Sequence, residues 1–543
     1  MYIIQILFKL LGILVRIALF LGLHWWLILV FTSAFISDLI MDIFHIEMFS
    51  EHIIFRNISN FMDFMFFYGG FIPALFITPR NIIRLITRNP EFSFFKLLFK
   101  PRTKRKERKF IMGSTKPLES KTSSIEDISG FFFGKRGHKY ITISEDKDGH
   151  ILVVGGPGTG KSSCIAIPTI ITWHERIFAI DIKGELSQKS GRLCQIFNPS
   201  DPNTLGYDPF YNLNNNNNRV ADAKEIALSL IPIPHDIKDP FWKESAQNLL
   251  TACILHFSSE NYNFIDTMAA IQSQPIEQLI EDIYQNTKDR DARLFINQFI
   301  GLDIKTLSGI YTELANKIMV FATDPQLKVA LSKKNNIQPS DLENGLDVFL
   351  SINEEKLEQW KGLLNLIVQQ FLKHFERRPD GEATPILFLL DEFARLGKID
   401  AIANGLATLR SKKIHICLIT QSLAQLDDIY GQSKRKVIVD CCSYKAILNA
   451  TDADTQEYFS RLIGTFEKEK VTNSASYEHF TKIGRGTGIS RSTEDKRIIK
   501  PEDFAYLDDI VLITPHGHMR VDKVYYFKEP LFTKFLEVTN KYK

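Results

Sequence analysis

Residues 150–163 read His-Ile-Leu-Val-Val-Gly-Gly-Pro-Gly-Thr-Gly-Lys-Ser-Ser, and the rest of the chain can be interpreted outward from them. The apolar run 151–154 is short enough to be a buried strand. It leads into Gly-x-x-x-x-Gly-Lys-Ser, the spacing of a phosphate-binding loop between a strand and a helix. Glycines let such a loop turn its backbone N–H groups toward the α- and β-phosphates, and the next helix adds its positive end. A glycine-rich turn that matches by chance is the alternative.

The side chains of this loop have distinct expected roles. Lys161 is expected to reach the β- and γ-phosphates, and the Ser162 hydroxyl to bind Mg²⁺, with Ser163 as the alternative metal ligand. The other loop residues expected to line the nucleotide are Gly155, Gly156, Pro157, Gly158, Thr159 and Gly160.

Length and composition limit the class of protein. A chain of 543 residues is too long for one hydrophobic core and should divide into several parts. The net charge of +3 is small for this length, so attraction to nucleic acid or membrane must come from local patches. The six cysteines form no C-x-x-C pair and mostly lie in apolar runs. They predict reduced thiols in a cytosolic body and support neither a zinc site nor a disulfide framework.

Residues 1–110 are interpreted as a membrane region. Two apolar runs, at about 11–36 and 58–78, are each long enough for a transmembrane helix, which needs about 20 residues. The segment between them is acidic, whereas a dense series of Lys and Arg follows the second run. Because basic residues stay on the cytoplasmic side, this asymmetry predicts a multi-pass protein with both termini and the main domain in the cytoplasm. The basic flank is expected to meet anionic membrane lipid, with a nucleic-acid patch as the alternative.

The cytosolic body is predicted to contain a parallel α/β sheet. Residues 111–130 are rich in Ser, Thr, Lys and Gly and predict a linker, and a short hairpin over 131–149 follows. Short apolar runs then alternate with helical patterns, which is typical of parallel α/β folds. The predicted strands after the loop are 176–181, 195–199, 346–352, 385–390, 414–420 and 444–449. The nucleotide-binding domain is assigned to 131–213 and 326–543.

Between these two parts the pattern becomes helical. From 214 to 325, apolar residues recur at helical spacing and no clear strand interrupts them, which predicts an inserted all-α domain. The all-asparagine run 214–218 marks a loop or boundary at its beginning.

Two expectations concern the C-terminal part. The polar stretch 468–496 is rich in Ser, Thr and Gly and predicts a mobile loop. The apolar runs 510–514 and 521–527 predict a terminal hairpin that turns through Pro515 to His518. His516 and His518 are interpreted as solvated turn residues without a functional role.

Acidic residues follow the strand at 385–390. Asp391 and Glu392 come at its carboxyl end, the edge of an open α/β sheet where ligands bind and where the phosphate loop also lies. Asp391 is expected to hold Mg²⁺ through its water shell, and Glu392 to polarise the attacking water. A purely structural acidic pair is the alternative.

Two further polar residues are candidates for the same chemistry. Gln421 stands at the tip of the next strand, where it could sense the γ-phosphate or simply bond to nearby backbone. Arg410 closes a helix that begins at about residue 400. It could be a solvated cation at a helix end, or an arginine finger that reaches the nucleotide of a neighbouring subunit.

Together these features resemble the coupling ATPases of type IV secretion and conjugation systems. The resemblance covers nearly the whole chain. The residues that carry it are 150–154 with the loop 155–163, Ile167-Pro-Thr-Ile170, Asp181-Ile-Lys-Gly-Glu185, Phe241-Trp242, Leu390-Asp-Glu-Phe393 with Leu396-Gly397, and Thr420-Gln-Ser422 with Ala424-Gln-Leu426 and Tyr430-Gly431.

The resemblance implies a RecA-like phosphate-loop ATPase domain with an inserted all-α domain and two N-terminal transmembrane helices. Such proteins form hexamers in the bacterial inner membrane, hydrolyse ATP with Mg²⁺, and deliver relaxase-bound DNA or effector proteins to type IV secretion channel components. The arginine finger of the family lies where Arg410 stands. Residues 211–213 depart from the Asn-Pro pair that the family often has, which leaves the edge of the insertion open.

Two other functions are alternatives to this one. A membrane-tethered DNA translocase of the chromosome or plasmid partition type usually carries a DNA-reading domain after the motor, and the sequence shows none. A binding-only membrane receptor would not need intact Lys161, Asp391 and Glu392. No Asn-Lys-x-Asp guanine-reading sequence occurs, which favours ATP over GTP. The sequence leaves open whether the cargo is DNA, protein or both.

Overall fold

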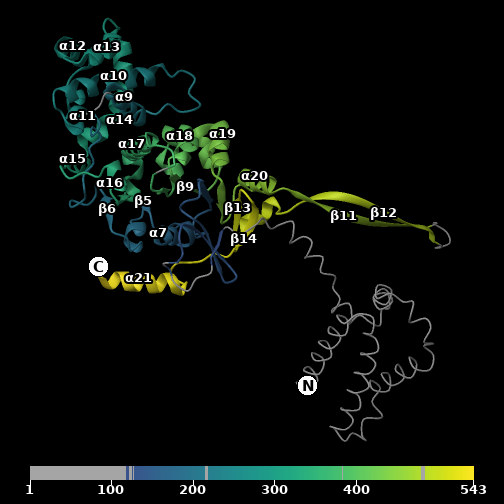
Figure 1. Cartoon of the computed structure of the whole chain (residues 1–543). Helices are drawn as coiled ribbons and strands as arrows, with labels where there is room; N and C mark the ends of the chain where they lie inside the picture. The colour runs from purple at the N-terminus through teal and green to yellow at the C-terminus, as the bar shows by residue number, and fades with distance from the viewer. Residues whose placement is uncertain are drawn as a thin grey trace, which may run out of the picture. The chain divides into compact units, whose positions relative to one another are not determined.

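In the computed structural model of the chain, the described residues are 118–542, with gaps at 121–124, 126, 214–217, 382 and 478–483 (Figure 1). The described region belongs to one compact unit, residues 104–543. The two predicted membrane spans, 11–36 and 58–78, and the basic flank after them lie outside the described residues. Among the helices described, none combines the length and apolar character that crossing a bilayer requires.

A nine-stranded sheet forms the centre of the unit, in the order β14-β13-β10-β4-β9-β8-β5-β7-β6 (Figure 1). The strands from β10 to β6 run parallel, and β13 and β14 add an antiparallel hairpin beside β10. Their bounds are β4 Ile151–Val154, β5 Arg176–Asp181, β6 Cys194–Phe197, β7 Asp347–Ser351, β8 Ile386–Leu390, β9 Ile414–Thr420, β10 Tyr444–Ile447, β13 Ile510–Thr514 and β14 Gly517–Val521. The predicted α/β sheet is confirmed.

The central strands are largely apolar because both faces of the sheet are covered. Every residue of β4, β8 and β9 is buried. Since successive side chains of a strand point to opposite faces, each strand supplies two cores. In β4, Leu152 and Val154 enter the larger core, whereas Ile151 and Val153 enter the smaller one.

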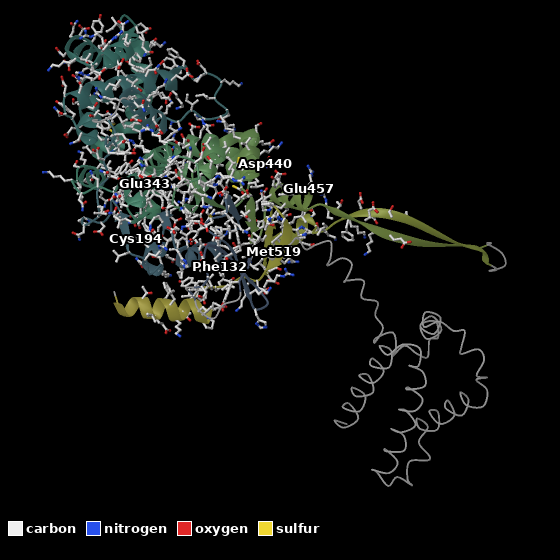
Figure 2. The ribbon with its side chains drawn as sticks, viewed as in Figure 1. Phe132, Cys194, Glu343, Asp440, Glu457 and Met519 are labelled. Carbon is white, nitrogen blue, oxygen red and sulfur yellow. The ribbon has the colours of Figure 1, made fainter. Side chains whose placement is uncertain are left out.

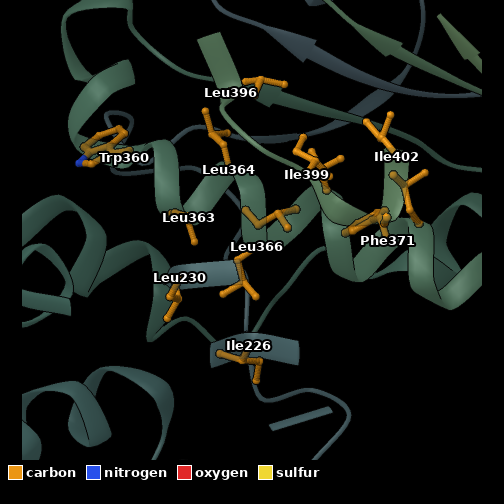
Figure 3. Close-up of a cluster of buried hydrophobic side chains, with 14 of the residues drawn as sticks. Ile226, Leu230, Trp360, Leu363, Leu364, Leu366, Phe371, Leu396, Ile399 and Ile402 are labelled. Carbon is orange, nitrogen blue, oxygen red and sulfur yellow. The ribbon is translucent and has the colours of Figure 1, made fainter. Parts of the chain in front are cut away.

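Helices cover the larger core. Apolar side chains of α17 (Leu357–Glu376), such as Leu366 and Phe371, pack with Leu230 of α9 (Arg219–Leu230) and Ile402 of α18 (Asp400–Ser411), as Figure 3 shows. The other helices of this part are α10 Phe241–Ser259, α11 Phe264–Gln272, α12 Ile276–Asn286, α13 Arg290–Asn297, α14 Ile304–Thr323, α15 Pro325–Leu331, α16 Pro339–Glu343, α19 Ala424–Cys441 and α20 Ala453–Ile463. Between residues 218 and 325 the described residues form helices joined by turns, with no strand among them, and their core is continuous with that of the sheet.

The smaller core lies under a second sheet of order β1-β3-β2. Its strands are β1 Glu119–Ser120, β2 Phe131–Arg136 and β3 Lys139–Ile143. Phe132 of β2 and Met519 of β14 both belong to this core, and Figure 2 labels them. The linker predicted over 111–130 therefore ends early, because β1 pairs with β3, and Leu118 and Ile128 are buried.

Residues 465–497 correct the prediction of a mobile loop. β11 (Thr465–Tyr477) pairs with β12 (Gly484–Arg497) along almost its whole length, and the two form a ribbon that runs out beyond α20 and β13 (Figure 1). The loop prediction is wrong because two strands can pair through their backbones without any apolar alternation in their sequence.

The terminal hairpin also differs from its prediction. Thr514 pairs with Gly517, so the turn contains only Pro515 and His516, and the second strand is β14 rather than 521–527. His516 is exposed, but His518 lies in β14 and is buried, and burial lowers its pKa. Only His516 is the solvated turn residue that was expected.

Candidate nucleotide-binding site

The loop after β4 has the conformation that its glycines allow. Gly158 and Gly160 adopt positive φ angles of 72° and 104°, which residues with a Cβ rarely adopt. A Cβ on Gly155 would lie 2.6 Å from Thr159 Oγ1. The Thr159 hydroxyl in turn donates a 2.8 Å hydrogen bond to the carbonyl of Gly156. The loop thus closes on itself as a phosphate-binding loop does.

The helix that follows begins within the motif. A π-helical segment, η5 (Lys161–Ala166), continues directly into α7 (Ile167–Thr172). The N–H of Cys164 donates to the carbonyl of Gly160 at 2.7 Å, which closes the first turn. Pro168 is the second residue of α7 and follows the π-helical turn of η5, where the continuous helix accommodates it.

The predicted phosphate and metal ligands lie together. Lys161 Nζ donates to the carbonyl of Gly156 at 3.1 Å and lies 4.0 Å from Glu392 Oε1. Burial lowers the pKa of Lys161, although Glu392 and Asp391 oppose this shift. Ser162 Oγ lies 3.5 Å from Asp391 Oδ2. The loop and the acidic pair therefore form one cluster at the carboxyl edge of the sheet.

The two carboxylates are held close at the end of β8. Asp391 is buried, and its Oδ1 accepts a 3.0 Å hydrogen bond from the Glu392 N–H. Burial, and next the charge of Glu392, raise the pKa of Asp391 to about 6. Glu392 has φ 49° and ψ 41°, a left-handed conformation that costs a residue with a side chain about 1 kcal/mol or more. Such strain is typical of a functional turn.

This donor set fits Mg²⁺. Carboxylate and hydroxyl oxygens are the ligands that Mg²⁺ prefers, and the ion usually takes only one or two of them, with phosphates and water completing its shell. Ser162 and Asp391 supply such a pair. In the described part of the chain, no three His, Cys, Asp or Glu side chains are grouped to hold a metal by themselves. A metal bound together with a nucleotide is consistent with both observations.

Gln421 joins the same cluster. It follows β9, which lies between β4 and β8 in the sheet, so its side chain lies between the loop and the acidic pair. Gln421 Nε2 donates to Glu392 Oε2 at 3.1 Å. Its side chain therefore bonds to a carboxylate of the cluster instead of to the nearby backbone.

Arg410 lies elsewhere. It is exposed near the end of α18, just before β9 begins, and its charge acts on His150 and Tyr444, which stand at the starts of β4 and β10. β9, whose seven residues span about 20 Å at 3.3 Å per residue, lies between Arg410 and Gln421 in the chain. The structure does not bring Arg410 to the phosphate loop of its own chain.

Asn449 is a site residue that the sequence analysis missed. It follows β10, the other neighbour of β4, and its Oδ1 accepts a 2.7 Å hydrogen bond from the N–H of Gly156. The signal was available, because a polar residue at the carboxyl end of a buried strand is the same pattern that singled out Gln421. Lys183, exposed after β5, is a second missed residue, since its charge acts on both Lys161 and Asp391.

Comparison with known proteins places this site in a family. Residues 100–543 match the family described as type IV secretory system conjugative DNA transfer. The chain belongs to this family. The resemblance found in the sequence is thereby confirmed. Among the relatives of this chain, Protein VirD4 of Agrobacterium fabrum is 27% identical over 434 residues, which cover 76% of this chain. The match covers 64% of VirD4, so the chain spans less than two thirds of that relative.

Solved structures agree with the fold of this family member. The plasmid coupling protein TrwB in complex with the ATP analogue ADPNP aligns with a TM-score of 0.59 and 19% identity, covering 78% of this chain and 92% of TrwB. TrwB in complex with ADP and Mg²⁺ aligns with a TM-score of 0.52 and 21% identity, covering 69% and 85%. At these identities the likeness concerns the fold, and it confirms the RecA-like α/β architecture.

Proposed function

We propose that this protein is an inner-membrane ATPase that recruits relaxase-bound DNA, effector proteins or both and delivers them to the components of a type IV secretion channel. The observation that carries the proposal is the convergence of Lys161, Ser162, Asp391, Glu392 and Gln421 on one phosphate loop. The family match supports transport by a conjugative system over the alternative of a chromosome or plasmid partition translocase.

ATP and Mg²⁺ are the proposed ligands. The solved complexes of TrwB with ADPNP and with ADP and Mg²⁺ support this choice. The loop N–H groups would bind the phosphates, and Lys161 would exchange its bond to the Gly156 carbonyl for the β- and γ-phosphates. Ser162 and Asp391 would hold Mg²⁺, which when bound neutralises charge on the phosphates.

Hydrolysis is assigned to the remaining cluster residues. Glu392 would polarise the attacking water, since its carboxylate already lies beside Lys161 and Gln421. Gln421 is bonded to Glu392, so loss of the γ-phosphate could be transmitted from Glu392 to β9 through this bond. We assign Gln421 the role of γ-phosphate sensor on this ground.

The assembly is proposed to be a membrane-anchored hexamer. Arg410 is exposed and distant from its own loop, which suits an arginine finger that completes the site of a neighbouring subunit. The segments 11–36 and 58–78 are proposed as two transmembrane helices with both termini in the cytoplasm. Residues 131–213 with 326–543 are proposed as the nucleotide-binding domain, and the helical insertion 214–325 as the place where cargo meets the ring.

The test combines ATP hydrolysis by the full-length protein with substrate transfer in cells. Lys161→Ala should abolish both, because the γ-phosphate loses its buried cation. Lys434→Ala changes an exposed lysine of α19 and serves as the matched control. Unchanged hydrolysis and transfer by the Lys161 variant would refute the motor assignment. Crosslinking during transfer, followed by identification of what is bound to 214–325, would show whether the cargo is DNA, protein or both.

A further inference from the structure

The segment between β14 and α21 (Pro530–Tyr542) returns to the phosphate loop. The N–H of Tyr526 donates a 3.1 Å hydrogen bond to the carbonyl of Ser163, the last residue of the loop motif. A stretch more than 350 residues away in sequence is thus attached to the end of the loop from which the helix departs. Its side chains lie beside the nucleotide site without taking part in the cluster of charges described above.

Tyr525 lies directly against the loop. A Cβ on Gly160 would lie 3.6 Å from Tyr525 Cε1, an ordinary van der Waals distance, so the ring lies close to the loop at Gly160. Burial, and next the neighbouring thiol of Cys164, one residue beyond the motif, raise the pKa of the Tyr525 hydroxyl. The ring remains partly exposed.

A second aromatic ring enlarges this surface. Phe527 is 52% exposed, which is unusual for a phenylalanine, and its ring centroid lies 5.5 Å from that of Tyr525 at an angle of 50°. Lys528 Nζ lies 5.2 Å from the Tyr525 centroid and 5.9 Å from the Phe527 centroid. An exposed lysine therefore covers a pair of rings that a planar ligand could also cover.

The aromatic pair is held in place by its own turn. The N–H groups of Lys528 and Glu529 both donate to the carbonyl of Tyr525, at 2.9 and 3.1 Å. The Glu529 carboxylate accepts hydrogen bonds from the Tyr140 hydroxyl at 2.7 Å and from Lys135 Nζ at 3.1 Å. The two rings are therefore presented by an anchored turn next to the loop.

We infer that Tyr525 and Phe527 form the platform on which the base of the bound nucleotide stacks. The inference rests on the proposed function, because it uses the nucleotide whose phosphates bind the loop. A base must extend from the phosphates along the loop surface, and the rings lie where the loop ends. Stacking of a base on an aromatic ring contributes about 5- to 150-fold in affinity, whereas an exposed cation–π contact contributes about 2- to 5-fold. A base can therefore displace Lys528.

The stacking platform also predicts how the site selects among bases. Stacking uses the face of a base and not its hydrogen-bonding edge, so adenine and guanine are held alike. Removal of the rings should then weaken ADP and GDP by the same factor. A loss confined to ADP would show that the edge of adenine is read there, and would contradict a pure stacking platform.

The test compares ligands with and without a base on the full-length protein in detergent. Isothermal titration of Tyr525→Ala with Mg²⁺-ADP is expected to give a Kd about tenfold higher than that of the wild type. The Kd of Mg²⁺-tripolyphosphate, which has no base, should be unchanged. Tyr525→Phe keeps the ring and should bind ADP almost normally. Tyr506→Ala removes an aromatic side chain that is 85% exposed and serves as the control.

The outcomes separate this inference from the function on which it rests. Equal losses for ADP and tripolyphosphate would mean that the turn merely supports the loop, and unchanged affinity for both would mean that no platform exists; either result overturns the inference. If the wild-type protein binds neither ligand, the proposed function fails. The expected result is a loss for ADP and GDP alone, in Tyr525→Ala and, to a smaller degree, in Phe527→Ala.

Discussion

The two edges of the nine-stranded sheet are organised in opposite ways. At the carboxyl edge, Lys161, Asp391 and Glu392 are partly or fully buried and already contact one another. At the amino edge, Arg410 is exposed to solvent at the end of a helix whose position is held by the buried His150. One edge is a preorganised reaction site, and the other exposes Arg410.

This difference indicates how a ring of subunits could use both edges of the sheet. The carboxyl edge would hold the subunit's own nucleotide, and the amino edge would complete the nucleotide site of a neighbour. In a head-to-tail ring, each interface joins two different surfaces of the same chain. A cation that completes a neighbour's site must be exposed and must not reach its own site, and Arg410 meets both conditions. Groups that stabilise charge on the reacting nucleotide are most effective when they are preorganised, as they are at the carboxyl edge.

The largest effect is expected from Arg410→Ala. An arginine finger contributes about 10³- to 10⁵-fold to hydrolysis, so the variant should lose at least about 10³-fold in rate while it keeps its affinity for ATP. Mixing it with Glu392→Gln should partly restore the rate, because some interfaces then combine an intact carboxyl edge with an intact finger. Steady-state hydrolysis over a range of mixing ratios measures this.

The control for that experiment is Arg461→Ala, which removes an arginine that is 73% exposed on α20. Its rate should equal that of the wild type. If no mixing ratio restored hydrolysis, Arg410 would act within its own chain as a structural residue, and the comparison of the two edges would lose its functional meaning.

Glu392→Gln should produce the next largest effect. Loss of a general base costs about 10²- to 10⁴-fold in rate, whereas nucleotide binding needs only the loop and the metal ligands. We expect hydrolysis to fall by about 10²-fold or more with the Kd for ATP little changed, as measured by single-turnover hydrolysis and equilibrium titration. Glu358→Gln, at an exposed position of α17, is the control. An equal loss of binding would instead make Glu392 a ligand-positioning residue.

The fold was largely predictable, for a physical reason that also explains the errors. Strands buried on both faces, such as β4, β8 and β9, are continuous apolar runs that are easily recognised. The ribbon of β11 and β12 is polar and pairs only through its backbone, so it has no apolar pattern to detect. In β14, the buried residues His518 and Met519 do not form an apolar run, so the strand was predicted at 521–527 instead of at Gly517–Val521.

The site was predictable where it depends on strand ends alone. Asp391, Glu392 and Gln421 each follow a strand, and the carboxyl ends of parallel strands meet at one edge. Asn449 was missed because its role depends on β10 lying beside β4, an order that tertiary packing decides over almost 300 residues of sequence. The position of Tyr525 depends on the chain returning to the phosphate loop after β14, which no local sequence pattern predicts.

Asn449→Ala should have a moderate effect on the carboxyl edge. The N–H of Gly156 loses its 2.7 Å acceptor, and an unsatisfied hydrogen bond of this kind costs about 1 kcal/mol, or about fivefold in affinity. Because the bond supports the loop itself, Mg²⁺-ADP and Mg²⁺-tripolyphosphate should weaken equally, in contrast to the Tyr525 variant. Asn203→Ala, at an exposed turn, is the control. Unchanged affinity for both ligands would show that Asn449 does not hold the loop.

The smallest effect at neutral pH is expected from the amino edge, at His150. Its Nε2–H donates to the Leu406 carbonyl of α18 at 2.5 Å, its Nδ1 accepts from the Ile416 N–H at 3.1 Å, and burial lowers its pKa to about 4. The pKa of an unfolded histidine is about 6.5, so the unfolded chain binds more protons between pH 6.5 and 4. The free energy of unfolding should therefore fall with decreasing pH in this window, by at most about 1.4 kcal/mol per pH unit from this residue.

His150→Gln tests this directly, because glutamine can still donate to Leu406 but does not titrate. The free energy of unfolding of the full-length protein is measured in urea at pH 7.5, 6.5, 5.5 and 4.5. It should fall less steeply with decreasing pH for the variant than for the wild type. The remaining slope comes from other buried histidines such as His415, whose pKa is also lowered by burial. Identical slopes would place the proton uptake elsewhere. His150→Ala should lower hydrolysis without changing ATP affinity, because α18, the helix that carries Arg410, then loses its bond to the residue before β4. A lower rate at unchanged affinity would link the two edges of the sheet through β4.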